Sequence, residues 1–181
     1  MTGRAYPDEA AADFEAPPSS FEDQEGRQID LAVATGADYE DLVEMYQAFD
    51  PEDRAQGVPP VRDEAIRDWI ETLLSDECVN VVARDGAVVV GHATLVPDTP
   101  PTEDDGGDYE LAIFVQHEYQ GAGIGTALLK ALLGRGQDEG VEKVWLTVER
   151  WNEPALALYR SVGFVTANAE TFEMEMAIRL H

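Results

Sequence analysis

The sequence predicts an α/β (α+β) fold: one mixed, mostly antiparallel sheet of about seven strands, flanked by about four helices. Three observations lead to this prediction. Apolar residues make up 44% of the 181 residues, which is enough for one sizeable core. The hydrophobic pattern changes repeatedly between a period of two, typical of strands, and a period of three to four, typical of helices. The resulting order, βααβββαβαββ, is not that of a regular parallel βα array.

The first half of the chain supplies three of the strands and two of the helices. Alternating apolar residues indicate strands, and apolar residues at helical spacing behind a capping residue indicate helices. Asp85-Gly86 is a dipeptide typical of hairpin turns. The elements predicted here are a strand over 29–33, helices beginning at 35–38 and at 63, and strands over 79–83 and 87–96.

The second half alternates strands and helices more regularly. Residues 97–108 contain three Pro, two Gly and five acids, a composition typical of a loop. The next stretch, 109–115, has few polar residues, which indicates a central strand buried on both faces. Gly134 and Gly136 should loosen the end of a helix that begins near 124. The remaining elements are a strand over 141–148, a helix from Pro154 to Gly163, and strands over 164–165 and 171–180.

The charge of the chain excludes several classes of partner. It has 37 acidic and 12 basic side chains, a formal charge of −25, and only two of the bases are lysine. Binding to nucleic acid or to an anionic membrane face requires clustered basic residues, so we expect neither. An acidic, lysine-poor composition is typical of a salt-adapted (halophilic) protein, because salt screens the repulsion between like charges.

Further features concern location and domain organisation. Cys78 is the only cysteine, so no disulfide forms within the chain. We find no run of 18 apolar residues and no signal-peptide pattern, and we therefore expect a cytoplasmic protein. Residues 1–27 are rich in Ala, Pro, Ser and acids, which predicts a disordered or loosely docked acidic arm. Residues 28–181 are expected to form a single domain.

The glycine-rich segment 120–126, QGAGIGT, joins a predicted buried strand to a helix N-terminus. Such a junction presents free backbone N–H groups and a partial charge of about +0.5, and glycine lets an anion come close. A phosphate or pyrophosphate is therefore the expected ligand. A P-loop would need a lysine here, and a dinucleotide fingerprint would need a third glycine where Thr126 stands. A tight turn without a ligand is the alternative.

Residues 120–125, QGAGIG, fit the Gln/Arg-x-x-Gly-x-Gly/Ala signature of the GNAT acetyltransferase superfamily, and residues 152–164, NEPALALYRSVGF, end in its aliphatic-Tyr-x-x-x-Gly-Phe pattern. The chain resembles this family over roughly 28–181, and faintly resembles its bacterial protein-lysine acetyltransferases. The resemblance implies a GNAT-type acyl-CoA fold, with acetyl-CoA as co-substrate between the fourth and fifth predicted strands, where they splay. The cofactor-binding residues that it implies are Ile113, Phe114, Val115, Gln120, Gly121, Ala122, Gly123, Ile124, Gly125, Thr126 and Asn152.

Acetyl transfer needs a neutral amine, so a base that removes its proton lowers the barrier. Glu110 is our candidate, because it lies ten residues before Gln120, where the bacterial lysine acetyltransferases carry a glutamate. Glu149 is the second candidate. The resemblance places Tyr159 near the sulfur, as the acid for the leaving thiolate. As alternatives, Glu110 is one of many solvated acids, Tyr159 a core aromatic and Asn152 a helix cap.

These residues predict an acetyl-CoA-dependent N-acetyltransferase that transfers the acetyl group directly to a primary amine, either a protein lysine or a small molecule. A non-catalytic acyl-CoA sensor or scaffold with the same fold is the alternative. His92, His117 and His181 lack ligand spacing, so no metal is expected, and His117 is expected to be a surface residue. A homodimer is compatible with this interpretation.

Overall fold

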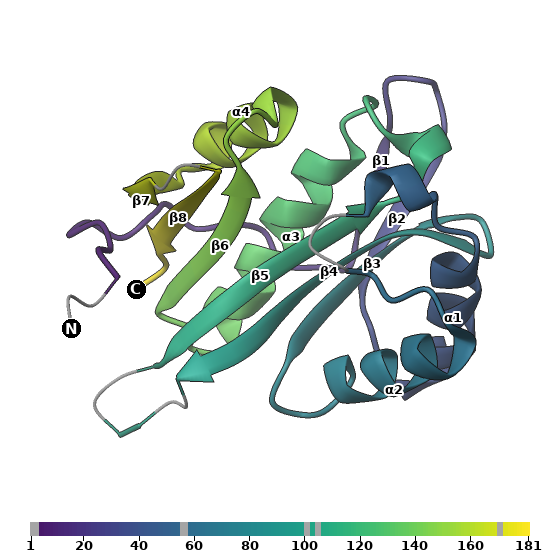
Figure 1. Cartoon of the computed structure of the whole chain (residues 1–181), viewed down its shortest axis with the longest axis horizontal. Coiled ribbons are helices and arrows are strands. Elements are labelled where there is room, and N and C mark those ends of the chain that lie inside the picture. Colours follow the sequence, from purple (N-terminus) through teal and green to yellow (C-terminus); the bar gives the residue numbers. More distant parts are fainter. Residues whose placement is uncertain (1–3, 55–57, 100–101, 104–105, 170–171) are drawn as a thin grey trace.

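The computed structural model describes residues 4–54, 58–99, 102–103, 106–169 and 172–181. Within these residues, eight strands form one sheet and four α-helices pack against it (Figure 1). In chain order they are β1 (Ser19–Glu22), β2 (Gln28–Val33), α1 (Tyr39–Gln47), α2 (Asp63–Leu73), β3 (Val79–Asp85), β4 (Val88–Thr99), β5 (Asp108–Val115), α3 (Ile124–Asp138), β6 (Lys143–Glu149), α4 (Glu153–Val162), β7 (Val165–Ala169) and β8 (Glu173–Arg179). Short 3₁₀ turns η1 (Gly36–Asp38), η2 (Pro51–Asp53) and η3 (His117–Tyr119) lie between them. None of the helices in these residues is long and apolar enough to cross a membrane.

The sheet has the order β1-β2-β3-β4-β5-β6-β8-β7. All neighbours are antiparallel except β5 and β6, which run parallel because α3 connects them. The predicted mixed, mostly antiparallel sheet with four helices is therefore confirmed. The eighth strand, β1, comes from the segment that we expected to be disordered.

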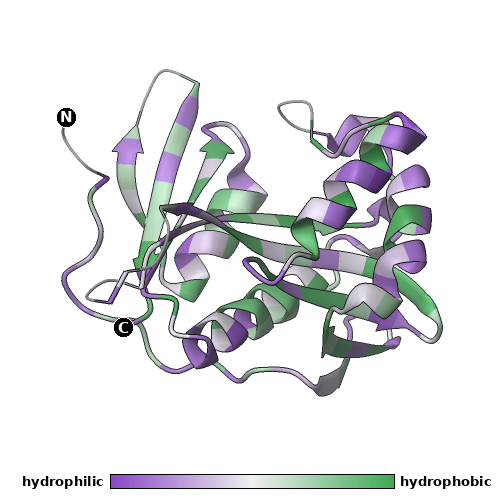
Figure 2. Cartoon of the chain, turned by 90° about the horizontal axis from the view of Figure 1, so that it is seen from below, coloured by the Kyte–Doolittle hydropathy of each residue, from purple (hydrophilic) through white to green (hydrophobic). Residues whose placement is uncertain are grey.

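The two faces of the sheet are covered differently. Helix α3 crosses behind the central strands, and its apolar residues form the larger core together with α4 and the strands (Figure 1). Helices α1 and α2 pack on the opposite face, over β3 and β4, around a second cluster that includes Tyr46 and Ile70. Along the helices, hydrophobic and hydrophilic residues separate onto different sides (Figure 2), as amphipathic packing requires.

The prediction of a disordered arm over 1–27 is wrong for the part of it that enters the sheet. Ser19–Glu22 pair antiparallel with β2, where Phe21 lies opposite Ile29. The preceding segment is held by backbone contacts, since Ala11 N–H donates to Arg179 O at 2.7 Å. Local composition did not indicate this order, because it depends on backbone pairing with β2 and, for the preceding segment, on a contact with the far end of the chain. The division into an arm and a domain stays a prediction.

Three local predictions also need correction. Helix α3 does not loosen at its two glycines but continues to Asp138. A Cβ on Gly134 would lie 2.7 Å from Phe14 O, and one on Gly136 would lie 3.0 Å from Leu95, so these glycines allow close packing. Strand β4 runs on to Thr99, into the predicted loop 97–108, of which 100–101 and 104–105 lie outside the described residues. The β3–β4 turn is formed by residues 86–87, one position later than predicted.

Candidate functional site

Strands β5 and β6 separate soon after they begin. They pair only over Asp108–Glu110 and Lys143–Trp145 in the described residues. From Leu111 onward, β5 keeps its pairing with β4 but has no partner on the β6 side. The backbone groups of this edge are thus available to an extended ligand that carries amides of its own. Ile113, Phe114 and Val115, predicted to line a cleft between splayed strands, lie in this part of β5.

The glycine turn follows directly and ends at the N-terminus of α3. Gly121 and Gly123 have φ of +72° and +91°, a backbone region that side chains disfavour. Gly123 is the N-cap of α3 and offers no side-chain cap, so the first N–H groups of the helix stay open to a ligand. Ala122 and Ile124 are buried, and any ligand contact with them is through the backbone. The turn is therefore suited to an anion.

Polar contacts hold this turn against neighbouring elements. The Gln120 side chain donates to Val115 O at 3.0 Å and to Asp53 Oδ2 at 3.1 Å, which ties the turn to β5 and to η2. From the β1–β2 connection, Gln24 N–H donates to Ala122 O at 3.0 Å. Helix α4 lies against the start of α3, since a Cβ on Gly125 would be in ordinary van der Waals contact with Leu158 at 3.7 Å.

A cation that sequence reasoning missed also lies beside this turn. The Arg27 guanidinium stacks over the Tyr119 ring, 4.2 Å from its centroid, and pairs with the buried Asp23 at 2.7 Å. The hydrogen bonds from Arg27 lower the pKa of Asp23 against the opposing effect of burial, which is the largest single influence on it. About ninety residues separate Arg27 from the turn, so no local pattern could have indicated this arrangement.

Glu110 lies where β5 and β6 begin to separate. It is in register with Val96 on β4 and with Trp145 on β6, and its side chain remains exposed. The protein atoms around the carboxyl group raise its pKa above the usual value, and the nearby Asp98 raises it further, while Arg4 lowers it. A carboxyl group with a raised pKa is a better proton acceptor once ionised, as a general base requires.

The other predicted catalytic residues lie further along the site. Glu149 ends β6, four residues beyond the position opposite Glu110, or about 13 Å along the strand. Tyr159 on α4 is 9% exposed, and its ring meets Phe164 edge-on at 5.7 Å. Burial raises the pKa of Tyr159 to about 12, so the phenol is protonated at neutral pH. The roles of these residues stay predictions.

Two further predicted binding residues stand at helix starts. Asn152 is the N-cap of α4, and its side-chain oxygen accepts from Ala155 N–H at 3.3 Å. The cap contact that we named as the alternative therefore exists, and a contact with a ligand stays a prediction. Thr126 lies in the first turn of α3 and is partly exposed.

Three titratable side chains meet next to Gln120, whose side chain donates to one of them, Asp53. Asp50, Asp53 and His117 offer ligand atoms within 4.8 Å of one another, an arrangement that the histidine spacing alone did not indicate. His117 is exposed, as predicted, and its Nδ1 lies 3.0 Å from Asp53 Oδ2. This hydrogen bond, together with the carboxylate charge, raises the pKa of His117. That the chain binds no metal stays a prediction.

Comparison with known proteins identifies the family. The profile of the acetyltransferase (GNAT) family matches residues 39–164. The N-alpha-acetyltransferase RimI of Mycobacterium tuberculosis is 47% identical over 87 residues, which cover 46% of this chain and 50% of that protein. The chain spans about half the length of the curated relatives it matches.

Solved structures share the fold. The GNAT domain of S. lividans PAT superposes with a TM-score of 0.76 at 18% identity, over 92% of this chain and 100% of that one. Salmonella typhimurium yncA, whose structure contains its cofactor acetyl-CoA, superposes with a TM-score of 0.65 at 20% identity, over 84% and 94% of the two chains. With the splayed strands, the glycine turn and a family match over 39–164, this chain belongs to the GNAT acetyltransferase family.

Proposed function

We propose that this chain is an acetyl-CoA-dependent N-acetyltransferase that transfers the acetyl group directly to a primary amine, with Glu110 as the general base. The observation that carries the proposal is the separation of β5 from β6 immediately after Glu110, next to an uncapped helix N-terminus. The acceptor is a protein lysine or a small amine.

Two features of the site support binding of acetyl-CoA. The pyrophosphate fits the N–H groups after Gly121, because two glycines with positive φ and an uncapped helix favour an anion there. The pantetheine amides fit the unpaired edge of β5 at 111–115, as an added strand would. These two sites are consecutive in the chain, so the pantetheine would run from the glycine turn along β5 from residue 115 toward residue 111. Its thioester end would then lie at the start of the splay, near Glu110.

The proposed reaction needs one proton acceptor and one hydrogen-bond donor. The amine nitrogen attacks the thioester carbonyl carbon, the C–N bond forms and the C–S bond breaks. Glu110 accepts the proton that the amine loses, directly or through a water molecule. Tyr159 remains protonated at neutral pH and donates a hydrogen bond to the leaving sulfur. Full proton transfer from this phenol to a thiolate of ordinary pKa, about 8.5, would be uphill, so the thiol takes its final proton from solvent.

Turnover and acetyl-CoA binding, measured separately, test this proposal. We expect release of free coenzyme A when the protein is given acetyl-CoA and a panel of amines and lysine peptides. The variant Gly123→Glu places a carboxylate at the proposed pyrophosphate site, and we expect acetyl-CoA affinity in calorimetry to fall at least about tenfold, or about 1.4 kcal/mol.

Gly140→Glu is the control, because Gly140 also has positive φ but lies beyond the other end of α3. A Cβ on Gly140 would meet nothing within 4 Å, and one on Gly123 would meet only the Gln24 side chain, at 3.4 Å. Equal affinities for the two variants would refute the anion site. Tight acetyl-CoA binding without turnover of any amine would instead favour the sensor alternative.

A further inference from the structure

An arginine from the N-terminal segment lies on the sheet face that carries Glu110. The Arg4 guanidinium carbon is 3.6 Å from the centroid of the Trp145 ring. Its Nε and Nη2 donate to the two carboxylate oxygens of Glu175 at 3.3 and 3.4 Å, and Nη1 lies 3.6 Å from Asp98. Only 17% of the Arg4 side chain is exposed. The guanidinium is thus held by an aromatic face, a two-point carboxylate contact and a second carboxylate.

The three sheet residues that hold Arg4 come from strands on both sides of the proposed base. Asp98 belongs to β4, Trp145 to β6 and Glu175 to β8, and the strand β5 that carries Glu110 runs between β4 and β6. Trp145 and Glu110 are register neighbours on adjacent strands, which lie about 4.8 Å apart. The cation therefore lies beside Glu110.

The Asp98–Trp145–Glu175 cage is part of the sheet, whereas Arg4 reaches it from a segment outside the sheet. The N-terminal segment runs past β8, where Arg179 Nε donates to Pro7 O at 2.8 Å (Figure 1). Without Arg4, the cage would leave two carboxylates around an indole face, a combination that recognises guanidinium and ammonium groups.

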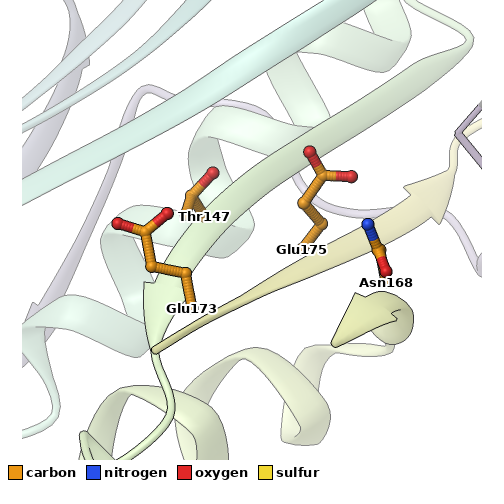
Figure 3. A pocket seen from close by; sticks show the side chains of 4 residues that line it. All are labelled: Thr147, Asn168, Glu173 and Glu175. Carbon is orange, nitrogen blue, oxygen red and sulfur yellow. The ribbon is translucent and has the colours of Figure 1, made fainter. Parts of the chain in front are cut away.

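The acidic surface continues beyond the cage. A hollow of about 110 Å³ is lined by Thr147, Asn168, Glu173 and Glu175. Glu173, Glu175 and Thr147 project from β8 and β6 to the same side (Figure 3). Glu175 thus belongs both to the cage and to the hollow, so a cationic molecule in the cage would extend along further carboxylates.

We propose that Asp98, Trp145 and Glu175 form a cation-binding subsite that receives a guanidinium or ammonium group of the acceptor, and that Arg4 fills this subsite until an acceptor displaces it. The inference rests on the proposed function, and it names the acceptor class: an amine that carries a second cationic group near the one to be acetylated. The N-terminal segment then acts as an internal competitor of the acceptor.

Binding of butylguanidinium, without acetyl-CoA, tests the subsite. The readout is the indole N–H resonance of Trp145 in NMR, assigned with Trp145→Phe. All proteins are compared at one KCl concentration at which they are folded. We expect Arg4→Ala to bind butylguanidinium at least fivefold more tightly than the unaltered chain, because the internal competitor is gone. Arg4→Gln should behave in the same way, and Arg4→Lys should remain closer to the unaltered chain.

Two controls separate the subsite from general attraction to an acidic protein. Arg135→Ala removes an arginine that pairs with Glu139 on the surface of α3. The affinity of this variant for butylguanidinium should equal that of the unaltered chain. Butylurea has nearly the shape of butylguanidinium without its charge, and it should not bind. Adding Glu175→Gln to Arg4→Ala should reverse the gain, whereas adding Glu71→Gln on exposed α2 should not.

The inference is overturned if Arg4→Ala binds butylguanidinium no more tightly than the unaltered chain, or if butylurea binds equally well. Its failure is distinguishable from failure of the proposed function. Turnover of simple monoamines by a protein that shows no gain with Arg4→Ala refutes the subsite alone. Tight butylguanidinium binding without turnover of any amine refutes the acetyltransferase proposal and leaves a cation site.

Discussion

One face of the sheet has two halves with different polar environments. In the covered half polar groups are buried and hydrogen-bonded, and in the open half charged groups reach water. Under α1 and α2, the side chain of His92 is fully buried, with Nδ1 2.6 Å from Tyr46 Oη and Nε2 2.8 Å from Asn80 Oδ1. Over β5, β6 and β8, charged side chains such as Glu110 and Glu175 remain partly exposed to water. A single carboxylate would be strongly disfavoured in the covered half, and a neutral hydrogen-bonded network would contribute little chemistry in the open half.

The difference shows where stability and reactivity reside. In the covered half, burial lowers the pKa of His92 to about 4, which keeps the ring neutral. The amide of Asn80 accepts from Nε2–H, so Nδ1 accepts from the Tyr46 hydroxyl, and both ring nitrogens are satisfied. In the open half, the surroundings of Glu110 disfavour its charged form and so raise its pKa. The ionised carboxylate is therefore a stronger proton acceptor. Substitutions in the covered half should therefore change stability, and substitutions in the open half should change turnover.

The largest expected effect is on turnover by Glu110→Gln. Removing a general base lowers the rate by about 10²–10⁴-fold, and acetyl-CoA affinity should hardly change, because the amide keeps the shape of the side chain. Initial rates of coenzyme A release at neutral pH measure this, and the loss should shrink at high pH, where more of the amine is neutral. Glu118→Gln, on the nearby η3, is the control and should keep its rate. If Glu149→Gln shows the loss in place of Glu110→Gln, the base lies at the other end of β6.

The second largest effect is acid destabilisation through His92. Unfolded histidine titrates near 6.5 and folded His92 near 4, so the unfolded state binds the extra proton between these values. The stability that the neutral His92 ring gives the folded state is fully present above pH 6.5. It is lost as the pH falls toward 4, by up to about 3 kcal/mol of unfolding free energy. Urea unfolding across this range measures it. His92→Gln should flatten the slope, and an unchanged slope would contradict the assignment.

His117 provides the opposite case for this experiment. Its hydrogen bond to Asp53 raises its pKa, so its contribution is present at acidic pH and is lost as the pH rises through the folded pKa. His117→Gln should therefore make the chain lose slightly more stability on acidification, the reverse of His92→Gln.

A third prediction concerns the partner of His92. Tyr46→Phe removes the hydroxyl and leaves a buried nitrogen without a donor, so we expect a loss of about 1–3 kcal/mol in unfolding free energy. Tyr39→Phe, on the same helix, removes a weaker and partly exposed contact of 3.4 Å to Arg67 O, and it should cost less. Chemical denaturation measures both. A loss no larger than that of Tyr39→Phe would mean that the covered network does not stabilise this half.

The smallest expected effect is a gain in stability from Glu110→Gln. The folded pKa of Glu110 is raised, so its ionised form is disfavoured in the folded protein. The stability that the protonated carboxyl group contributes at low pH is therefore lost as the pH rises through the folded pKa. The neutral amide avoids this cost, so the thermal midpoint should rise slightly at pH 7 and stay unchanged at pH 4, where the carboxyl is largely protonated. A lower midpoint at pH 7 would show that Glu110 is structural.

Local signals in the sequence determined most of the fold and the centre of the site. Hydrophobic period, caps and breakers placed the helices and the strands from β2 to β8, because these elements depend on residues close in the chain. The glycine turn was predictable for the same reason, since only glycine readily adopts the φ values found at Gly121 and Gly123. Glu110 was found as a candidate because the resemblance to bacterial protein-lysine acetyltransferases implies a glutamate at this position, ten residues before Gln120.

Tertiary structure alone decided the rest, because it depends on residues that are distant in sequence. No pattern in 1–27 indicates that Arg4 contacts β4, β6 and β8, or that Arg27 stacks beside the glycine turn. The same holds for the two glycines near the end of α3, where close packing overrides helix propensity. Side-chain chemistry was visible in the sequence, and the fold determined which charges lie beside Glu110 and therefore the environment that its carboxyl group experiences.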